Sequence, residues 1–237
     1  SEQSYHYFMH HHLFDHIDID PKNIHIPDGT LKAEEIENFC KEYERQIEAA
    51  GGIDIQVLGI GRTGHIGFNE PGSPLTSKTR MVYLDDLTIK DAAGDFGGME
   101  NVPSRAITMG VGTIMKARKV ILLAWGEKKA SIIKATVEGS VSDAVPATFL
   151  QVHPNVQFVI DESAAEELTR ANQPWLVSKV QWNDKLIRSA IVWLCQLTGK
   201  PILKLTNKDY NENGLSELLA LYGSAYNVNI KIFNDLQ

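Results

Sequence analysis

The chain has 237 residues, a formal net charge of -7 and a hydrophobic fraction of 43%. This length and composition suffice for a full apolar core, and they predict one main domain with an additional segment. The acidic balance argues against a general binder of nucleic acid or of anionic membranes, because such proteins carry a basic face. The sequence contains no apolar run of 18 residues and no signal-peptide pattern, which predicts a soluble, cytoplasmic protein.

Strands and helices are predicted to alternate between residues 23 and 169. Continuous Val, Ile and Leu runs separated by helical patterns are typical of parallel sheets. The expected fold class is therefore α/β, a doubly wound, Rossmann-like parallel sheet with helices on both faces. The predicted strands cover residues 23–27, 53–58, 80–84, 105–110, 119–125 and 156–161, and the predicted helices cover residues 31–49, 85–93, 111–117, 127–137 and 162–169.

The pattern changes near residue 170, where Asn172-Gln173-Pro174 indicates a linker. We therefore expect a first domain over residues 1–170 and an extension over residues 171–237. The extension is expected to be α/β or to link the chain to a further domain. Its predicted elements are a helix over 183–197, a strand over 202–205, a helix over 214–222 and an apolar end over 228–233.

The cysteines and the N-terminal histidines are interpreted as structural residues, although both residue types can bind metals. Cys40 and Cys195 lie in predicted helices and are expected to be buried free thiols. Near the N-terminus, His6/His10 and His12/His16 have the i,i+4 spacing of a zinc pair on a helix. No ligand from a third element is evident nearby, so we interpret these histidines as a helix surface and predict no metal site.

A glycine-rich loop, residues 59–73, follows the strand predicted at 53–58. Glycine lets backbone N–H groups approach a ligand closely, and Gly61, Arg62 and Gly64 are the candidate substrate-binding residues of this loop. The loop also carries His65 and, five residues later, Glu70. An imidazole with a carboxylate suits acid–base chemistry on a small polar anion. Because ligands bind at the carboxyl ends of parallel strands, this loop is the predicted site.

The loop and several other segments resemble, in order, the glucosamine-6-phosphate deaminase (isomerase) family. The resemblance covers roughly residues 4 to 169. It is carried by residues 4–9 (Ser-Tyr-His-Tyr-Phe-Met), 23–29 (Asn-Ile-His-Ile-Pro-Asp-Gly), 64–71 (Gly-His-Ile-Gly-Phe-Asn-Glu-Pro), 77–80 (Ser-Lys-Thr-Arg), 106–113 (Ala-Ile-Thr-Met-Gly-Val-Gly-Thr) and 149–154 (Phe-Leu-Gln-Val-His-Pro).

This resemblance implies conversion of glucosamine 6-phosphate and water into fructose 6-phosphate and ammonium. The sugar ring opens, a proton moves from C2 to C1 through an enediol-type intermediate, and the amine leaves. By resemblance, His65 carries the proton between the ring oxygen and the C1 hydroxyl, and Glu70 is its supporting carboxylate. By resemblance, Lys129 holds the phosphate. This proton transfer and imine hydrolysis imply no cofactor and no catalytic metal.

The sequence departs from the family pattern in three ways. Active members carry an aspartate where this chain has Thr63, and a hydroxyl cannot hold an imidazolium as a carboxylate does. The phosphate-binding arginine of the family is expected near residues 93–95, where this chain has no arginine. The family's general-base aspartate and main phosphate loop belong to an N-terminal part that the chain lacks. We therefore expect the chain by itself to be inactive.

Alternative functions remain open at this point. A non-catalytic sugar-phosphate-binding or scaffolding domain is favoured by Thr63 and by the absent arginine. A 6-phosphogluconolactonase shares the fold, but residues 68–71, Phe-Asn-Glu-Pro, fit the deaminases better. The expected partners are a small-molecule sugar phosphate, a second copy of the chain in a homo-oligomer, and a fused deacetylase-like domain, which the tail beyond residue 170 resembles in longer proteins. Nucleic acid and membranes are not expected partners.

Overall fold

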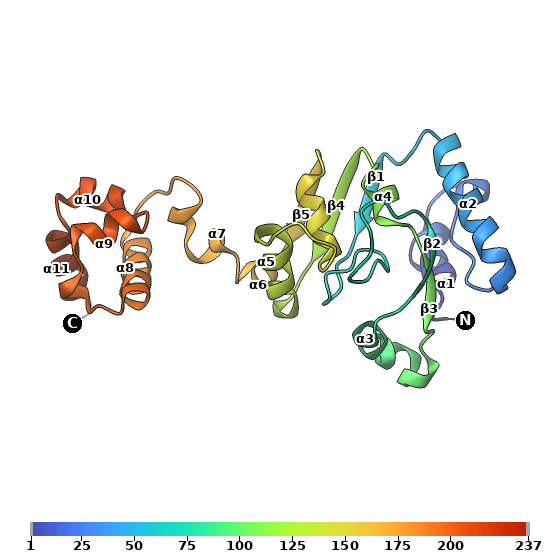
Figure 1. The fold of residues 1–237 in the computed structure, drawn as a ribbon, viewed down its shortest axis with the longest axis horizontal. Helices are drawn as coiled ribbons and strands as arrows, with labels where there is room; N and C mark the ends of the chain where they lie inside the picture. The colour runs from blue at the N-terminus through green and yellow to red at the C-terminus, as the bar shows by residue number, and fades with distance from the viewer. Residues whose placement is uncertain (1, 236–237) are drawn as a thin grey trace. The chain divides into compact units, whose positions relative to one another are not determined.

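The computed structural model describes residues 2–235, and these form two compact units, unit 1 up to Ala165 and unit 2 from Glu166. Unit 1 contains a parallel sheet, a separate strand pair and helices (Figure 1). Unit 2 is built from helices in its described residues. None of the helices in the described part of the chain has the length and apolar character that a membrane crossing requires.

The parallel sheet of unit 1 has three strands, β1 (Ile55–Leu58), β4 (Lys119–Ala124) and β5 (Val156–Ile160), in the order β1-β4-β5 (Figure 1). Both pairings are parallel. Three of the strands predicted from continuous apolar runs are therefore confirmed, as is the predicted α/β class. Because the strands are parallel, the loops that follow β1 and β4 leave the sheet at the same edge.

The two faces of this sheet differ in their burial. Val120, Leu122 and Ala124 of β4 point to one face and are buried. On β1, the residues that point to the other face are Ile55 and Val57, and they are 58% and 55% exposed. Alternate residues of a strand point to opposite faces, so the sheet buries one face thoroughly and leaves apolar side chains of β1 in water on the other.

Several short helical segments complete the unit around the buried face. They contribute fully or almost fully buried apolar side chains, among them Ile114, Ile133 and Leu150. These segments are α4 (Val111–Ile114), the 3-10 turn Glu127–Lys129, α5 (Ala130–Glu138), the 3-10 helix Pro146–Val152 and α6 (Glu162–Ala165). The helix predicted over residues 162–169 is thus interrupted after Ala165.

The strand pair of unit 1 is antiparallel and separate from the parallel sheet. It consists of β2 (Arg80–Tyr83) and β3 (Arg105–Thr108), which are connected through α3 (Asp86–Phe96). After α3 the chain turns through Gly97 and Gly98, which have φ of 69° and 146°, and it returns beside β2. The strands predicted at 80–84 and 105–110 are therefore present but do not belong to the parallel sheet.

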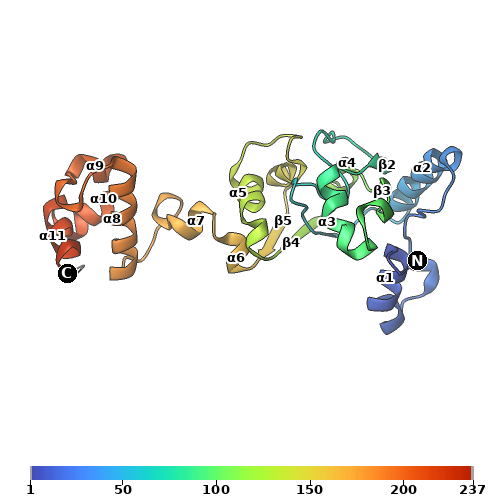
Figure 2. The same cartoon turned by 90° about the horizontal axis from the view of Figure 1, so that it is seen from below.

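The N-terminal part of unit 1 contains two α-helices, α1 (Tyr5–His12) and α2 (Ala33–Ala49). Helix α2 packs beside β2 (Figure 2) and confirms the helix predicted over residues 31–49. The strand predicted at 23–27 is wrong. Pro21 opens a 3-10 helix that ends at Asn23, and the Asp20 side chain accepts a hydrogen bond from the amide of Lys22. The turn takes up only the first residue of the predicted strand. After it, Ile24 has extended backbone angles, but residues 24–27 belong to neither sheet of the described part of the chain.

Unit 2 is a small helical bundle with its own apolar core. Its helices are α7 (Thr169–Asn172), α8 (Asp184–Thr198), α9 (Asn207–Glu212), α10 (Ser216–Tyr222) and α11 (Ala225–Asp235). Ala190, Ile191, Leu194 and Leu218 are among its fully buried residues. The helices predicted at 183–197 and 214–222 are present.

The predicted α/β character of the extension is wrong, because no strand occurs between residues 166 and 235. The segment expected as a strand at 202–205 forms a 3-10 turn, Ile202–Lys204, after Pro201. The carbonyl of Leu205 accepts a hydrogen bond from the buried Asn229 side chain of α11. The turn is thus tied to a helix, whereas a short apolar run by itself does not distinguish strand from helix.

Both cysteines are free thiols. Cys40 on α2 is buried, as predicted, and Cys195 on α8 is only half-buried. Burial raises the pKa of both thiols, which keeps them in the neutral form near neutral pH.

Candidate active site

The glycine-rich loop leaves the carboxyl end of β1 and is anchored to the interior. Ile66 and Asn69 are fully buried. The side-chain amide of Asn69 donates hydrogen bonds of 2.8 Å from Nδ2 to the backbone carbonyl oxygens of Ile66 and Met109. Met109 directly follows β3. The amide of Phe68 donates to the hydroxyl of Thr108 at 3.0 Å. The loop thus continues from β1 and is tied by hydrogen bonds to the end of β3.

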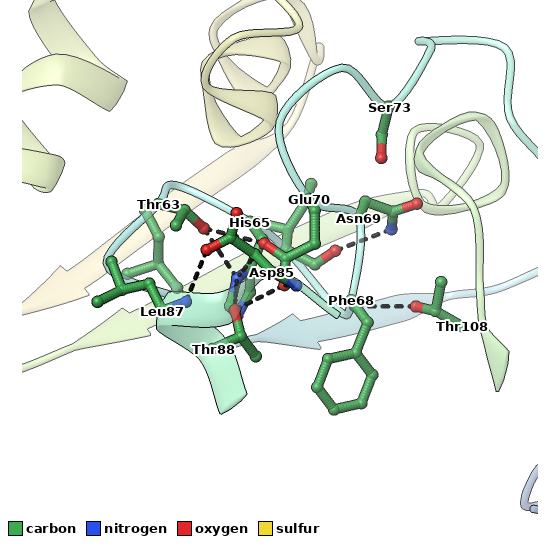
Figure 3. A network of polar contacts seen from close by, with 12 residues as sticks. Thr63, His65, Phe68, Asn69, Glu70, Ser73, Asp85, Leu87, Thr88 and Thr108 are labelled. Atoms are coloured by element: carbon green, nitrogen blue, oxygen red, sulfur yellow. Dashed lines mark hydrogen bonds and ion pairs between the residues drawn. The ribbon is translucent and has the colours of Figure 1, made fainter. Parts of the chain in front are cut away.

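His65 and Glu70 form the centre of a polar cluster on this loop (Figure 3). Nδ1 of His65 lies 3.0 Å from Oε2 of Glu70. An ionised carboxylate can only accept hydrogen bonds, so the shared proton lies on Nδ1 of the imidazole. The two side chains are only 15% and 12% exposed. The imidazole–carboxylate pair predicted from the sequence is therefore brought together in the structure.

Thr63 joins this pair. Its hydroxyl donates a hydrogen bond of 3.1 Å to Oε2 of Glu70 and lies 3.0 Å from Nδ1 of His65 (Figure 3). A hydroxyl can donate to the carboxylate and at the same time accept from the ring N–H. Thr63 therefore supports the geometry of the pair without adding a second negative charge.

Thr88, which no sequence motif singles out, also contacts the cluster. Its hydroxyl, on the first turn of α3, donates a hydrogen bond of 2.6 Å to Oε1 of Glu70 (Figure 3). The amide of Asp85 lies 3.4 Å from the same oxygen. Helix α3 was predicted, but nothing in its sequence pattern indicates that its first turn contacts the glycine loop.

The environment of Glu70 favours its ionised form. Burial raises the pKa of a carboxyl group, but the hydrogen bonds from His65 and Thr88, the charge of His65 and the amide of Asp85 together outweigh burial. They lower the pKa of Glu70 from 4.5 to about 2. Glu70 is therefore a fixed hydrogen-bond acceptor near neutral pH.

Gly61 provides the space that the imidazole occupies. A Cβ atom placed on Gly61 would overlap Cε1 and Nε2 of His65. A Cβ on Gly64, which has a φ of 80°, would collide with the side chain of Val145. The N–H groups of Gly61 and Gly64 donate to the carbonyl oxygens of His65 and Gly61, respectively. Both N–H groups are therefore used in hydrogen bonds within the loop. In this structure the absence of a Cβ at each glycine allows the side chains of His65 and Val145 to lie against the loop backbone.

Two cations lie near the same loop. Nζ of Lys129 donates a hydrogen bond of 2.8 Å to the carbonyl oxygen of Ile60. Burial lowers the pKa of Lys129, the charge of Asp91 opposes this effect, and the nearby charge of Arg62 adds to it. Arg62 forms an ion pair of 3.4 Å with Asp91 of α3. The positive charges of Lys129 and Arg62 therefore repel one another beside the loop that follows β1. An anionic group of a ligand placed between them would reduce this repulsion.

The histidines of α1 and of the 3-10 turn Phe14–His16 that follows it make local contacts. Rings of His6 and His10 stack with centroids 4.5 Å apart, and His10 also contacts Asp15 at 3.2 Å. His16 interacts with the carbonyl oxygen of His11 at 2.8 Å. Across residues 2–235, no three His, Cys, Asp or Glu side chains are grouped so that they could hold a metal ion.

A family model described as glucosamine-6-phosphate isomerases/6-phosphogluconolactonase matches residues 1–159. A glucosamine-6-phosphate deaminase-like protein of Bacteroides thetaiotaomicron is 64% identical over 225 residues, which is 95% of this chain and 34% of that protein. The glucosamine-6-phosphate deaminase of Thermoanaerobacter pseudethanolicus is 53% identical over 163 residues, which is 69% of this chain and 64% of that protein.

Among solved structures, a monomeric glucosamine-6-phosphate deaminase is similar with a TM-score of 0.68 and 40% identity. The match covers 70% of this chain and 68% of that structure. The chain thus spans about a third of its Bacteroides relative and less than two thirds of the Thermoanaerobacter enzyme.

Proposed function

Because the chain belongs to the family of glucosamine-6-phosphate isomerases and 6-phosphogluconolactonases, we propose that it is a glucosamine-6-phosphate deaminase-like domain of amino-sugar metabolism. The reaction is hydrolytic deamination with aldose–ketose isomerisation, which yields fructose 6-phosphate and ammonium. The observation that carries the proposal is the 3.0 Å contact between Nδ1 of His65 and Oε2 of Glu70. The 53% identity to an enzyme named for this reaction supports the deaminase over the 6-phosphogluconolactonase.

His65 is the proposed proton carrier for opening of the sugar ring. With Nδ1 engaged by Glu70, Nε2 is the ring nitrogen that can take a proton from the C1 hydroxyl and return it to the ring oxygen. Glu70 fixes the tautomer and stabilises the imidazolium that forms during this transfer. General acid–base catalysis of this kind contributes about 10²–10⁴-fold to a rate.

Lys129 and Arg62 are the proposed cations for the phosphate of the substrate. Their proximity to the loop and to each other supports this role, because a dianion between them would replace repulsion by attraction. Gly61 and Gly64 contribute to the substrate site by allowing His65 and Val145 to approach the loop backbone.

The movement of a proton from C2 to C1 needs a base beyond this cluster. By the family resemblance, that base belongs to a segment outside the matched part, and the chain spans less than two thirds of the Thermoanaerobacter enzyme. We therefore propose that the 237-residue chain binds the sugar phosphate without turning it over. Steady release of ammonium by the purified chain would contradict this part of the proposal.

The second candidate is a non-catalytic sugar-phosphate-binding domain. Thr63 favours it, since Thr63 stands where active members of the family have an aspartate and cannot hold an imidazolium by charge. The two candidates share the site and the ligand, and they differ only in turnover by a polypeptide that contains the complete domain.

Three further features are proposals that rest on the family. They are a cytoplasmic location, a homo-oligomeric assembly and fusion to a deacetylase-like domain, with residues 1–170 as the sugar-phosphate domain and residues 171–237 as a separate extension. The match to 95% of this chain by a relative that is about three times longer supports an extension within a larger protein.

Binding and turnover of glucosamine 6-phosphate test the proposal. Calorimetry on the chain should show binding that Lys129→Ala weakens about tenfold or more, while Lys128→Ala, at an exposed neighbouring position, leaves it unchanged. Ammonium release by a longer polypeptide that contains this sequence should fall about 10²–10⁴-fold in His65→Ala. Binding without turnover in the longer polypeptide would favour the second candidate, and absence of binding would reject both.

A further inference from the structure

We propose that Thr88 is a positioning residue of this site, whose hydroxyl holds the Glu70 carboxylate in the one orientation that orients His65. This inference rests on the proposed function for its catalytic meaning, but its geometry is independent of turnover. Thr88 lies on α3, outside the loop that carries the imidazole and the carboxylate.

The two oxygens of Glu70 have separate partners. Oε2 faces the loop, where it accepts from Nδ1 of His65 at 3.0 Å and from the hydroxyl of Thr63 at 3.1 Å. Oε1 faces α3, where it accepts from the hydroxyl of Thr88 at 2.6 Å (Figure 3). The Thr88 bond is the shortest of the three, and O–H···O⁻ bonds of this length are among the strong hydrogen bonds of proteins.

Without this hydroxyl, Oε1 would retain only the amide of Asp85, at 3.4 Å. A carboxylate held firmly by one oxygen can rotate about its terminal torsion, which is a broad, two-fold torsion in glutamate. Rotation would change the direction from which Oε2 meets His65. Because Glu70 is only 12% exposed, bulk water has little access to replace the missing donor.

The start of α3 explains why Thr88 has this position. The side chain of Asp85 caps the helix by accepting a hydrogen bond of 2.8 Å from the amide of Leu87. The cap fixes the first turn, and the Asp85 amide and the Thr88 hydroxyl then meet the same carboxylate oxygen. The Thr88 hydroxyl also lies 3.4 Å from Nδ1 of His65, so it is close to both members of the imidazole–carboxylate pair.

Thr63 alone would not perform this task. Its hydroxyl contacts the oxygen that already faces His65, so it donates nothing to Oε1. Thr63 of the glycine loop and Thr88 of α3 therefore each donate to a different oxygen of the Glu70 carboxylate. This arrangement supplies by hydrogen bonds part of the orientation that a second carboxylate would otherwise impose on the imidazole.

Nuclear magnetic resonance on the 237-residue chain tests the proposal directly. Thr88→Val removes the hydroxyl at nearly constant volume, and Thr88→Ser restores a hydroxyl. We expect Thr88→Val to raise the pKa of the Glu70 carboxyl, followed by its ¹³C shift, by about 1. We also expect the ring ¹⁵N shifts of His65 to change from the Nδ1-protonated tautomer toward a mixture. Thr88→Ser should keep the wild-type values for both.

Thr198→Val is the matched control, because it removes a threonine hydroxyl that donates to the Leu194 carbonyl in unit 2. It should leave both signals unchanged. If Thr88→Val remains folded by circular dichroism and both signals keep their wild-type values, the positioning role is rejected. If the signals change but no polypeptide containing the sequence releases ammonium, the positioning role stands and the deaminase proposal fails. If the signals are unchanged in Thr88→Val and a longer polypeptide with this substitution releases ammonium at the wild-type rate, the deaminase proposal stands and the positioning role fails.

Discussion

The interior of unit 2 and the interior beside the glycine loop of unit 1 use polar groups differently. In unit 2, the buried Tyr210 hydroxyl donates to Asn229 at 2.7 Å, and Asn229 donates to the Leu205 carbonyl. These groups satisfy one another and connect turns to helices. Beside the loop of unit 1, the two oxygens of Glu70 accept hydrogen bonds from Nδ1 of His65 and from the hydroxyl of Thr88.

The polar groups of the two interiors therefore have different roles, structural in unit 2 and site-forming in unit 1. In unit 2, Asp209 is an example of a polar group with several structural partners, because it accepts hydrogen bonds from Lys200 and from the amide of Thr206 at the start of α9. Nε1 of the buried Trp175 is an exception and has no hydrogen-bond partner. The polar groups beside the glycine loop of unit 1 instead place several donors around one negative charge, that of Glu70, and one of these donors is the imidazole of His65. The contrast predicts that core substitutions dominate stability in unit 2 and that polar substitutions alter the site in unit 1.

The largest effect is expected for Leu194→Ala in unit 2. Leu194 is fully buried on α8, so the substitution should lower the free energy of unfolding by about 2–5 kcal/mol. Val192→Ala, at a position on the same helix that is 40% exposed, should change it by less than about 0.5 kcal/mol. Three of the four tryptophans, Trp175, Trp182 and Trp193, belong to this core, so denaturant unfolding can be followed by fluorescence. Equal effects of both substitutions would contradict the assigned core.

The next effect concerns pH and unit 1. The folded-state pKa of Glu70 is about 2 against 4.5 for the free group, so the unfolded state binds the proton more readily. The stabilisation is fully present above pH 4.5 and is lost as pH falls from about 4.5 to about 2, at most about 3 kcal/mol. Hydrogen exchange of unit 1 peptides between pH 2.5 and 6 should show this loss, and Glu70→Gln should reduce its pH dependence.

Asp209 provides the counterpart in unit 2, since its pKa is also lowered to about 2, mainly by the hydrogen bond from Lys200. Asp209→Asn should therefore reduce the acid sensitivity of unit 2 peptides and leave those of unit 1 unchanged. If hydrogen exchange of unit 1 in Glu70→Gln has the same pH dependence as in the wild type, the folded structure does not favour the ionised form of Glu70.

The smallest of these effects on stability, and the one most specific to the site, is expected for Gly61→Ala. The added methyl group overlaps the imidazole of His65, so the ring must move, at an expected cost of about 1–3 kcal/mol. Gly59→Ala is the matched control, because nothing lies within 4 Å of a Cβ at Gly59. Ring ¹⁵N shifts of His65 should change in Gly61→Ala only. If both variants keep the wild-type ring ¹⁵N shifts, the close approach of the His65 ring to Gly61 is contradicted.

Periodic and long elements were predictable from the sequence. Helix α2 has apolar residues at three- and four-residue spacing and a double-glycine end, and β4 is a continuous apolar run. Short segments were not predictable, because the run at 202–205 has too few residues to show a period. The antiparallel pairing of β2 with β3 depends on the turn after α3, which strand propensity does not encode.

The site was predictable only where its parts are close in sequence. His65 and Glu70 are five residues apart on one anchored loop, so their meeting followed from the glycine-rich pattern. Thr88 and Glu70 are eighteen residues apart and belong to different elements. Their contact depends on how α3 docks, which is a tertiary property, and therefore no local pattern could reveal it.

The wet face of strand β1 sets a practical condition on every measurement of this chain. Ile55 and Val57 expose more than half of their apolar surface to solvent. Removing such apolar surface from water is favourable whatever covers it. We therefore expect molecules of this chain to associate through the exposed face of β1 as their concentration rises. Affinities and unfolding midpoints should therefore be recorded over a dilution series, with light scattering at each step, before they are ascribed to single molecules.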